Sequence, residues 1–279
     1  MGGTTVEAEN RLAGAAFEVR NVRYRYDRVV ALDGATLTVP AGLRLALVGA
    51  NGSGKSTLLR LLDALYFAES GAVQFEGETL TEARFDDEAF AFDFRRRVGM
   101  LFQNPDVQLF NPSVFDEVAF GPLQLRWPGG EIRSRVEAIL EGLHIAHLKD
   151  RPPHRLSGGE KKRVAIASVL ILDPQVLLLD EPTAALDPQS QSQMIEIISG
   201  WKDSGRTVVT ATHDLEILEE IADRCLVFRA GRVVAEGTPA EILQDEELLR
   251  QTGLLHAHRH THGSGEVHSH PHRHHEHRH

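Results

Sequence analysis

One stretch of the sequence combines glycines, a lysine and a hydroxyl group in a spacing that suits phosphate binding. Residues 49–56 are GANGSGKS and match the pattern G-x-x-x-x-G-K-S/T. The glycines let backbone amides point at phosphate oxygens, and the helix predicted to follow adds its positive end. We expect Lys55 to contact the β- and γ-phosphates of a nucleoside triphosphate and the Ser56 hydroxyl to bind Mg²⁺. The predicted phosphate-binding residues are Gly49, Ala50, Asn51, Gly52, Ser53, Gly54, Lys55, Ser56 and Thr57.

Two carboxylates follow a short apolar run further along the chain. Residues 176–179 are VLLL, and Asp180 and Glu181 come next. Such a run is typical of a buried strand, whose carboxyl end lies at the edge where α/β sheets bind ligands. Acidic residues after a strand are often only loop caps. Behind a phosphate loop, we expect Asp180 to hold Mg²⁺ and Glu181 to act as general base toward the attacking water.

A third candidate is the segment LSGGE at residues 156–160, at the start of a predicted helix. Ser157 and Glu160 have the spacing of a capping box, which explains the pair without any ligand. Gly158 and Gly159 each cost about 1 kcal/mol relative to alanine inside a helix, yet they leave the helix end open to an anion. The residues alone therefore leave plain capping and a second phosphate site as alternatives.

Apolar runs and helical periodicity outline the elements that position these residues. Strands are predicted between residues 17 and 39 and at residues 43–48, 73–75, 99–102, 176–179, 207–211, 226–229 and 233–236. Helices are predicted at residues 55–65, 131–143, 158–172, 189–199 and 215–222. Strands that alternate with helices indicate an α/β protein with a mostly parallel sheet. Residues 104–165 contain several prolines and helical patterns, and we interpret them as a helical insertion.

Composition limits the class of protein. The chain has 279 residues, of which 42% are hydrophobic and 25% charged, as in an ordinary globular protein. Its net charge of −10 argues against broad binding to nucleic acid, which needs basic surface. The single cysteine, Cys225, cannot form an internal disulfide, and a reducing cytosol fits. The richest apolar stretch, residues 164–172, is about half the length of a bilayer-spanning helix, so any role at a membrane is expected to be peripheral.

Taken in order, the motifs resemble those of the ATP-binding subunit of ABC transporters over residues 17–249. The matching segments are the P-loop at 49–57, the Q-loop glutamine Gln103, the signature at 156–160, Walker B at 176–181, the D-loop at 185–187 and the switch histidine His213. The resemblance implies the P-loop NTPase fold of ABC ATPases, with a mostly parallel core sheet, an antiparallel β subdomain and a helical subdomain at about 104–165. The small and polar residues 1–15 are expected to form a flexible N-terminus, followed by an ATPase domain at 16–250 and a separate tail at 251–279.

The resemblance also implies roles for individual residues. Tyr26 corresponds to the aromatic that stacks on adenine, although Tyr24 is a neighbouring candidate and core packing is an alternative. Gln103 is expected to contact Mg²⁺ and to sense a transmembrane partner, and His213 to contact the γ-phosphate. The signature residues Ser157, Gly158 and Gly159 are expected to contact ATP held by a second, head-to-tail subunit.

This chain departs from the family pattern at two places. Ala185 stands where the family usually has serine, which puts the D-loop contact in doubt. Lys161 and Lys162 stand where glutamine is more usual after the signature, and we expect little effect from them.

Two further stretches, residues 102–110 and 116–122, resemble the energy-coupling-factor class of importers. In that class, two ATPase subunits, copies of one chain or a chain and its paralogue, lie beneath a transmembrane coupling subunit that joins a membrane substrate-binding subunit. Phe110, Val114 and Phe115 either supply an apolar contact to the coupling subunit or pack in the core. Substrates of the class include cobalt, nickel and vitamins.

The tail at residues 256–279 carries 11 of the chain's 15 histidines and almost no apolar residues, so we expect it to be disordered. Imidazoles at every second position suit Ni²⁺, Co²⁺ or Zn²⁺. An added purification tag or a merely solvated tail are alternatives. The expected metal ligands are His256, His258, His260, His262, His268, His270, His272 and His274.

The sequence thus predicts an ATP-hydrolysing, Mg²⁺-dependent subunit at the cytoplasmic face of the cell membrane that powers uptake of nickel or cobalt. The same ATPase with a vitamin or other organic cargo is one alternative. A metal-storage protein that nucleotide only regulates is another. A nucleic-acid partner is not expected.

Overall fold

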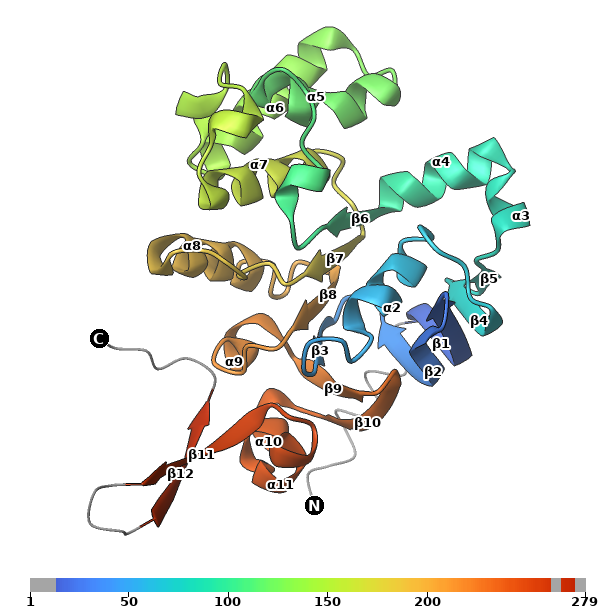
Figure 1. Ribbon diagram of the computed structural model, residues 1–279. Coiled ribbons are helices and arrows are strands. Elements are labelled where there is room, and N and C mark those ends of the chain that lie inside the picture. The colour runs from blue at the N-terminus through green and yellow to red at the C-terminus, as the bar shows by residue number, and fades with distance from the viewer. Residues whose placement is uncertain (1–13, 262–266, 274–279) are drawn as a thin grey trace.

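The computed structural model describes residues 14–261 and 267–273 (Figure 1). Its central sheet has six strands in the order β10-β9-β3-β8-β7-β6. The pairs β3–β8, β3–β9, β7–β8 and β6–β7 are parallel, and only the hairpin β9–β10 is antiparallel. The strands are β3 (Arg44–Val48), β6 (Val98–Leu101), β7 (Val176–Asp180), β8 (Thr207–Thr212), β9 (Arg224–Arg229) and β10 (Arg232–Gly237). The predicted mostly parallel sheet is confirmed.

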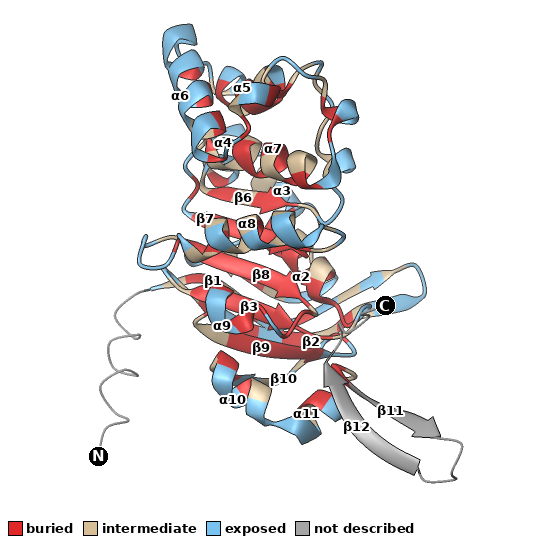
Figure 2. Ribbon diagram, turned by 90° about the vertical axis from the view of Figure 1, so that its left-hand side faces the viewer, coloured by how far each residue is buried: buried red, intermediate tan, exposed pale blue. Residues whose placement is uncertain are grey.

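The strands β3, β7 and β8 are buried along their whole length, which explains the apolar runs LALV in β3 and VLLL in β7 (Figure 2). The buried strand β8 has the sequence TVVTAT and combines threonines with apolar residues. Alternate residues of β7 enter different hydrophobic clusters on the two faces of the sheet. Leu177 and Leu179 pack with the helices α5 to α9, whereas Val176 and Leu178 pack with α2 and the antiparallel sheet. Because both faces are covered, β7 holds its carboxyl end in a fixed position.

A second, antiparallel sheet has the strand order β2-β1-β4-β5 and confirms the predicted β subdomain. Its strands are β1 (Ala15–Tyr26), β2 (Val29–Pro40), β4 (Ser70–Phe75) and β5 (Glu78–Thr79). Between the two sheets lies the helix α2 (Lys55–Leu62), which buries six of its eight residues. The β1–β2 hairpin and α2 therefore place both the phosphate loop and Tyr26 on one side of the core.

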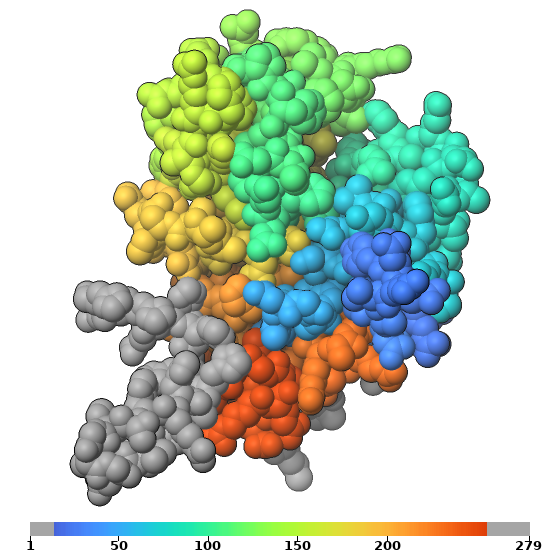
Figure 3. All heavy atoms as spheres, viewed as in Figure 1, coloured from blue at the N-terminus to red at the C-terminus, as the bar shows by residue number. Residues whose placement is uncertain are grey.

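The helical subdomain lies at one end of the central sheet, and Figure 3 shows it (green to yellow) as the top of the molecule, apart from the N-terminal strands (blue). Its helices are α5 (Val114–Gln124), α6 (Gly129–Gly142) and α7 (Gly158–Leu170), with short 3₁₀ turns η1 (Pro105–Val107), η2 (Ala146–Leu148) and η3 (Pro153–Arg155). Sequence analysis missed α5 because Gly121 and Pro122 within it are poor helix formers. It also missed α3 (Glu82–Phe85) and α4 (Glu88–Arg97).

The remaining helices are α8 (Pro188–Ser199), α9 (Leu218–Ile221), α10 (Pro239–Gln244) and α11 (Glu246–Gln251). None of the helices that the structure describes has the length and hydropathy needed to cross a bilayer.

Within the tail, β11 (Leu255–Thr261) pairs with β12 (Val267–Arg273) in an antiparallel ladder that is separate from the other two sheets. An isolated two-stranded hairpin is at best marginally stable in water, so this pairing is compatible with the expected disorder. Residues 1–13 of the predicted flexible N-terminus at 1–15 lie outside the described residues, and so do the predicted ligands His262 and His274. Ala15, the last residue of that predicted segment, begins β1.

Candidate ATP-binding site

The phosphate loop connects the buried strand β3 to the helix α2. Gly52 and Gly54 have φ angles of 79° and 111°, in the left-handed region that favours glycine. A Cβ on Gly54 would also stand 2.6 Å from the carbonyl oxygen of Ala31. Because the N-cap of α2 is Gly54, no side chain caps this described helix end. The first amides of α2 and the positive end of its dipole are therefore available to an anion.

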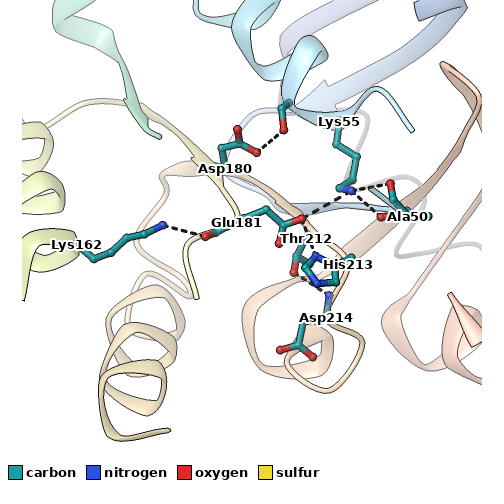
Figure 4. A network of polar contacts seen from close by, with 10 residues as sticks. Ala50, Lys55, Lys162, Asp180, Glu181, Thr212, His213 and Asp214 are labelled. Carbon is teal, nitrogen blue, oxygen red and sulfur yellow. Dashed lines mark hydrogen bonds and ion pairs between the residues drawn. The ribbon is translucent and has the colours of Figure 1, made fainter. Parts of the chain in front are cut away.

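Lys55 is a buried cation at the start of α2, with 4% of the residue exposed. Its Nζ donates to the carbonyl oxygens of Gly49 at 2.6 Å and Ala50 at 3.3 Å, and lies 3.8 Å from Oε1 of Glu181 (Figure 4). Burial lowers the pKa of Lys55, and the charges of Glu181 and Asp180 oppose this shift. The lysine is thus folded over its own loop, in the position from which it can reach a bound phosphate.

The strand β7 brings Asp180 to Ser56, another of the predicted magnesium ligands. The Oγ atom of Ser56 donates to Oδ1 of Asp180 at 2.7 Å. Burial raises the pKa of Asp180, against the hydrogen bond from Ser56 and the charge of Arg60. Mg²⁺ prefers hard oxygen ligands and commonly takes only one or two from the protein, keeping water and phosphate oxygens for the rest. This hydroxyl–carboxylate pair beside the open end of α2 fits Mg²⁺ bound together with a triphosphate.

The carboxylate of Glu181 lies close to two basic side chains, those of His213 and Lys55. Its Oε1 is 3.0 Å from Nδ1 of His213 and 3.8 Å from Nζ of Lys55. The hydrogen bond to Glu181 raises the pKa of His213. The backbone of Glu181 has a φ of 45°, an unusual conformation for a residue with a side chain. The carboxylate is therefore aimed into the phosphate site by a strained turn at the end of β7.

The predicted adenine-contacting residue lines the same cavity. A cavity of about 490 Å³ is bounded by Tyr26, the phosphate loop, Gln103 and Glu181. The hydroxyl oxygen of Tyr26 accepts a hydrogen bond from Nη1 of Arg60 at 3.1 Å. Tyr24 instead stacks on Tyr66, with ring centroids 5.4 Å apart. The structure thus brings Tyr26, Lys55, Ser56, Gln103, Asp180, Glu181 and His213 together and leaves Tyr24 packed to one side.

The signature segment does not line this cavity. Ser157 caps α7, and its capping box with Glu160 is complete. Ser157 and Gly158 are exposed, whereas Gly159 is buried against α8, where a Cβ would stand 2.7 Å from Cβ of Ser190 and closer still to its Oγ. Plain capping is thus present, and the contact of the signature with ATP remains a prediction about a second subunit.

One contact escaped sequence analysis. Lys162, for which little effect was expected, is buried and its Nζ donates to the carbonyl oxygen of Glu181 at 3.0 Å. Burial lowers the pKa of Lys162 to about 8, against the charges of Asp180 and Glu181. Lys162 lies three residues after Gly159 and four residues before Ile166, and all three are buried. This spacing places Lys162 on the face of α7 that packs against the core, so the sequence offered a signal for its burial.

The three apolar residues that follow the Q-loop have different surroundings. Val114 is fully buried and Phe115 packs partly against the core, so for these two residues the structure shows the core-packing alternative. Phe110 is 68% exposed, and its ring meets that of Phe120 edge to face, with centroids 5.0 Å apart. Val107 and Leu123 are also exposed. Phe110 and Phe120 are in contact, Val107 precedes Phe110 by three residues and Leu123 follows Phe120 by three. We call Val107, Phe110, Phe120 and Leu123 the apolar patch.

No group of three or more His, Cys, Asp or Glu side chains suited to a metal ion occurs in the described part of the chain. The side chains of the predicted tail ligands lie outside that part.

Comparison with known proteins places these features in a family. Residues 32–184 match the family model described as ABC transporter. The chain is 57% identical over 243 residues to the nickel import ATP-binding protein NikO of Rhodobacter capsulatus, covering 86% of this chain and 96% of that protein. It is 43% identical over 238 residues to the energy-coupling factor transporter ATP-binding protein EcfA of Methanothermobacter thermautotrophicus, covering 85% of this chain and 75% of that protein.

A solved structure has the same fold. It is cbiO1 from Clostridium perfringens, described as part of the ABC transporter complex cbiONQ, with a TM-score of 0.73 and 38% identity over 86% of this chain and 95% of that chain. The chain therefore belongs to the ABC transporter family, as an ATP-hydrolysing subunit of the importer type that includes the nickel-import and energy-coupling-factor ATP-binding proteins.

Proposed function

We propose that this subunit powers the uptake of a transition metal ion, nickel or cobalt, through an energy-coupling-factor transporter at the cytoplasmic face of the cell membrane. The observation that carries the motor role is the cavity lined by Lys55, Ser56 and Glu181. Asp180 is hydrogen-bonded to Ser56 and His213 to Glu181, so both lie directly behind these lining residues. The choice of cargo is supported by the 57% identity to a protein named for nickel import.

The side chains of the cavity divide the work of hydrolysis. The amides of the phosphate loop and Lys55 bind the phosphates, and Ser56 and Asp180 hold Mg²⁺, which supplies positive charge against the phosphate oxygens. Lys55 leaves its contacts with Gly49 and Ala50 for the phosphates, which also removes one cation from Glu181. Glu181 then accepts the proton of the attacking water, while His213 contacts the γ-phosphate and keeps the carboxylate in place.

A second ATPase subunit completes the site in this proposal. The cavity is lined by the phosphate loop, the β1–β2 hairpin, Gln103 and Glu181 of one chain, whereas the exposed Ser157 and Gly158 do not line it. Two chains arranged head to tail bring the signature of each to the ATP held by the other. Closure on ATP and reopening after hydrolysis then supply the movement that drives transport.

The apolar patch is the proposed contact with the transmembrane coupling subunit. It begins four residues after Gln103, which lines the ATP cavity, so the docking surface and the nucleotide are linked by a short segment. Exposed apolar clusters on a protein surface commonly mark interaction sites. A membrane substrate-binding subunit joined to the coupling subunit selects the cargo.

The histidine-rich tail is the proposed collector of metal ions near the transporter. Neutral imidazole suits Ni²⁺, Co²⁺ and Zn²⁺, and a chain with many histidines can gather several around one ion. The tail raises the local metal concentration and does not itself choose the transported ion.

Uptake of radioactive nickel and cobalt tests this proposal in cells that encode the chain. Deleting the chain is expected to reduce accumulation of one of the two metals to background, wild-type chain to restore it, and Glu181→Gln to fail to restore it. A chain ending at Leu255 is expected to restore uptake fully at micromolar metal and only partly at nanomolar metal.

Two results would support the alternatives. Normal metal uptake in the deletion, together with lost uptake of a vitamin such as biotin or thiamine, would establish the organic-cargo alternative instead. Metal uptake that Glu181→Gln fully restores would favour the storage alternative.

A further inference from the structure

A buried lysine connects the signature helix to the strained residue at the end of β7. Only 2% of Lys162 is exposed, and its Nζ donates to the carbonyl oxygen of Glu181 at 3.0 Å (Figure 4). The preceding Lys161 reaches in another direction, where its Nζ lies 2.6 Å from Oδ1 of the exposed Asp106. Burying an ammonium group is costly unless the group is hydrogen-bonded to a partner. The contact with Glu181 is the one hydrogen bond of the Lys162 side chain within the described residues.

The peptide groups on both sides of Glu181 are fixed by neighbouring elements. Its N–H donates to the carbonyl oxygen of Ala211 on β8 at 2.9 Å. Its carbonyl oxygen accepts from Lys162 and, at 3.2 Å, from the N–H of Ala184 in the following turn. A residue with a side chain in the left-handed region costs on the order of 1–3 kcal/mol and persists only where its surroundings impose it. Lys162 is the one tether of this set that comes from the helical subdomain.

We propose that Lys162 is a positioning residue that holds the Glu181 backbone in the left-handed conformation from which its carboxylate faces the phosphate site. This inference rests on the proposed role of Glu181 as general base. The charge-assisted hydrogen bond from Lys162 fixes the orientation of the Glu181 peptide plane, and the side chain then meets Lys55 and His213. Without the ammonium group of Lys162, the carbonyl of Glu181 can rotate, and the Glu181 carboxylate no longer points into the phosphate site. The phosphate loop is unchanged.

The placement of Lys162 also joins the two ATP sites of a head-to-tail pair. Lys162 lies five residues after Ser157 on the same helix, and Ser157 faces the ATP of the other subunit in the proposed pair. A shift of α7 on engaging that ATP is passed through Lys162 to the general base of its own site. The lysine is thus a direct link from the signature of one site to the base of the other.

Steady-state hydrolysis of MgATP by the full-length chain, with MgATP binding measured at equilibrium, tests the inference. Lys162→Met keeps the shape of the side chain and removes the donor. We expect it to lower kcat by about 10–100-fold, the effect of a misaimed catalytic group, with KM and nucleotide affinity within about threefold. Lys162→Arg, which keeps a charged donor, is expected to recover most of kcat. Lys161→Met is the matched control, because its exposed ion pair contributes little, and its kcat is expected within about twofold of wild type.

Several results would overturn the inference. They are a kcat of Lys162→Met close to that of wild type, a fall in kcat matched by an equal fall in ATP affinity, and no recovery in a stably folded Lys162→Arg. Thermal unfolding of each variant shows whether a fall in kcat comes from loss of the folded structure or from a displaced Glu181 carboxylate. If Lys162→Met does not fold, Lys162→Leu takes its place, since its shorter apolar side chain also lacks a donor. Glu181→Gln is measured alongside: if it retains turnover, the general-base assignment fails, whereas an inactive Glu181→Gln with a fully active Lys162→Met removes the positioning role alone.

Discussion

The N-termini of α2 and α7 both lie in segments that contain glycines, yet the first amides of the two helices are satisfied differently. At α2 the N-cap is Gly54, which has no side chain to offer, whereas at α7 Ser157 and Glu160 form a complete capping box. The first four amides of any α-helix lack partners within the helix. Those of α2 are therefore left to a ligand, while α7 already satisfies part of its own set.

The two helix ends also differ in burial. Lys55, the first residue of α2, is buried beneath the phosphate loop, whereas Ser157 and Gly158 are exposed. A preformed, partly buried end with an adjacent lysine can bind phosphate within one chain. In the proposed head-to-tail pair, the exposed end of α7 exchanges solvent and part of its cap for a phosphate that the other chain holds. On this proposal, we expect α2 to bind the nucleotide first and α7 to close the site later.

The largest expected effect is on the affinity for MgATP, and it distinguishes nucleotide binding at α2 from closure of the site at α7. Lys55→Met is expected to weaken equilibrium binding of MgATP by about 10–100-fold, because a hydrogen bond to a charged group contributes roughly 1.5–3 kcal/mol. Ser157→Ala is expected to leave the affinity of the single chain within about threefold and to lower steady-state turnover about tenfold. The two are compared by titration calorimetry and by phosphate release. Equal losses of affinity in both variants would show that the two helix ends act alike.

A smaller effect tests why the signature needs its second glycine. In Gly159→Ala the new Cβ would overlap Ser190 on α8, and overpacking of this kind costs about 1–3 kcal/mol. At roughly 2–4 °C per kcal/mol, the Tm is expected to fall by about 2–12 °C. At Gly158 the nearest atom to a new Cβ, the carbonyl oxygen of Ala185, is 4.0 Å away, so Gly158→Ala is the matched control and is expected to keep its Tm within about 3 °C.

A second substitution checks the cause of the Gly159→Ala effect. Ser190→Gly removes both atoms that the new methyl group meets, so the double variant is expected to be more stable than the sum of the two single changes predicts. Additive losses would mean that Gly159 is required for another reason, such as access of a ligand to the helix end.

The sequence predicted the α2 end better than the α7 end for a physical reason. The phosphate loop is specified by residues next to one another, and the apolar strand β3 before it identifies its context. At α7, capping and ligand binding use the same local pattern, so Ser157 and Glu160 could not distinguish them. The close packing of Gly159 on Ser190 joins two helices far apart in sequence, and no local pattern reports it.

The difference between local sequence patterns and contacts between distant residues also explains the other agreements and misses of the sequence predictions. The run VLLL predicted β7 correctly, since a continuous apolar run is typical of a strand covered on both faces. Val114 gave no such signal, because its burial depends on the packing of α5, a helix whose own sequence contains a glycine and a proline. Lys162 was underestimated because its partner, a backbone carbonyl at Glu181, has no sequence signature.

The smallest expected effect is the pH dependence of the contact between His213 and Glu181, which belongs to the α2 side of the comparison. The hydrogen bond from His213 to Glu181 raises the pKa of the folded-state imidazole above its ordinary value of 6.5, although burial and the charge of Lys55 oppose the shift. A group whose pKa is raised in the folded state stabilises the folded chain fully at pH values below its unfolded-state pKa. This contribution is lost as the pH rises through the folded-state pKa.

Nucleotide-free wild type is therefore expected to have a higher Tm than His213→Gln at pH 6, by no more than about 4 °C, and the difference is expected to be smaller at pH 8.5. Thermal unfolding at the two pH values, with Ser157→Ala as a control that has no titrating group, measures the difference. A Tm gap between wild type and His213→Gln that is the same at both pH values, or wider at pH 8.5, would show that the imidazole is not the charged partner of Glu181 in the resting chain.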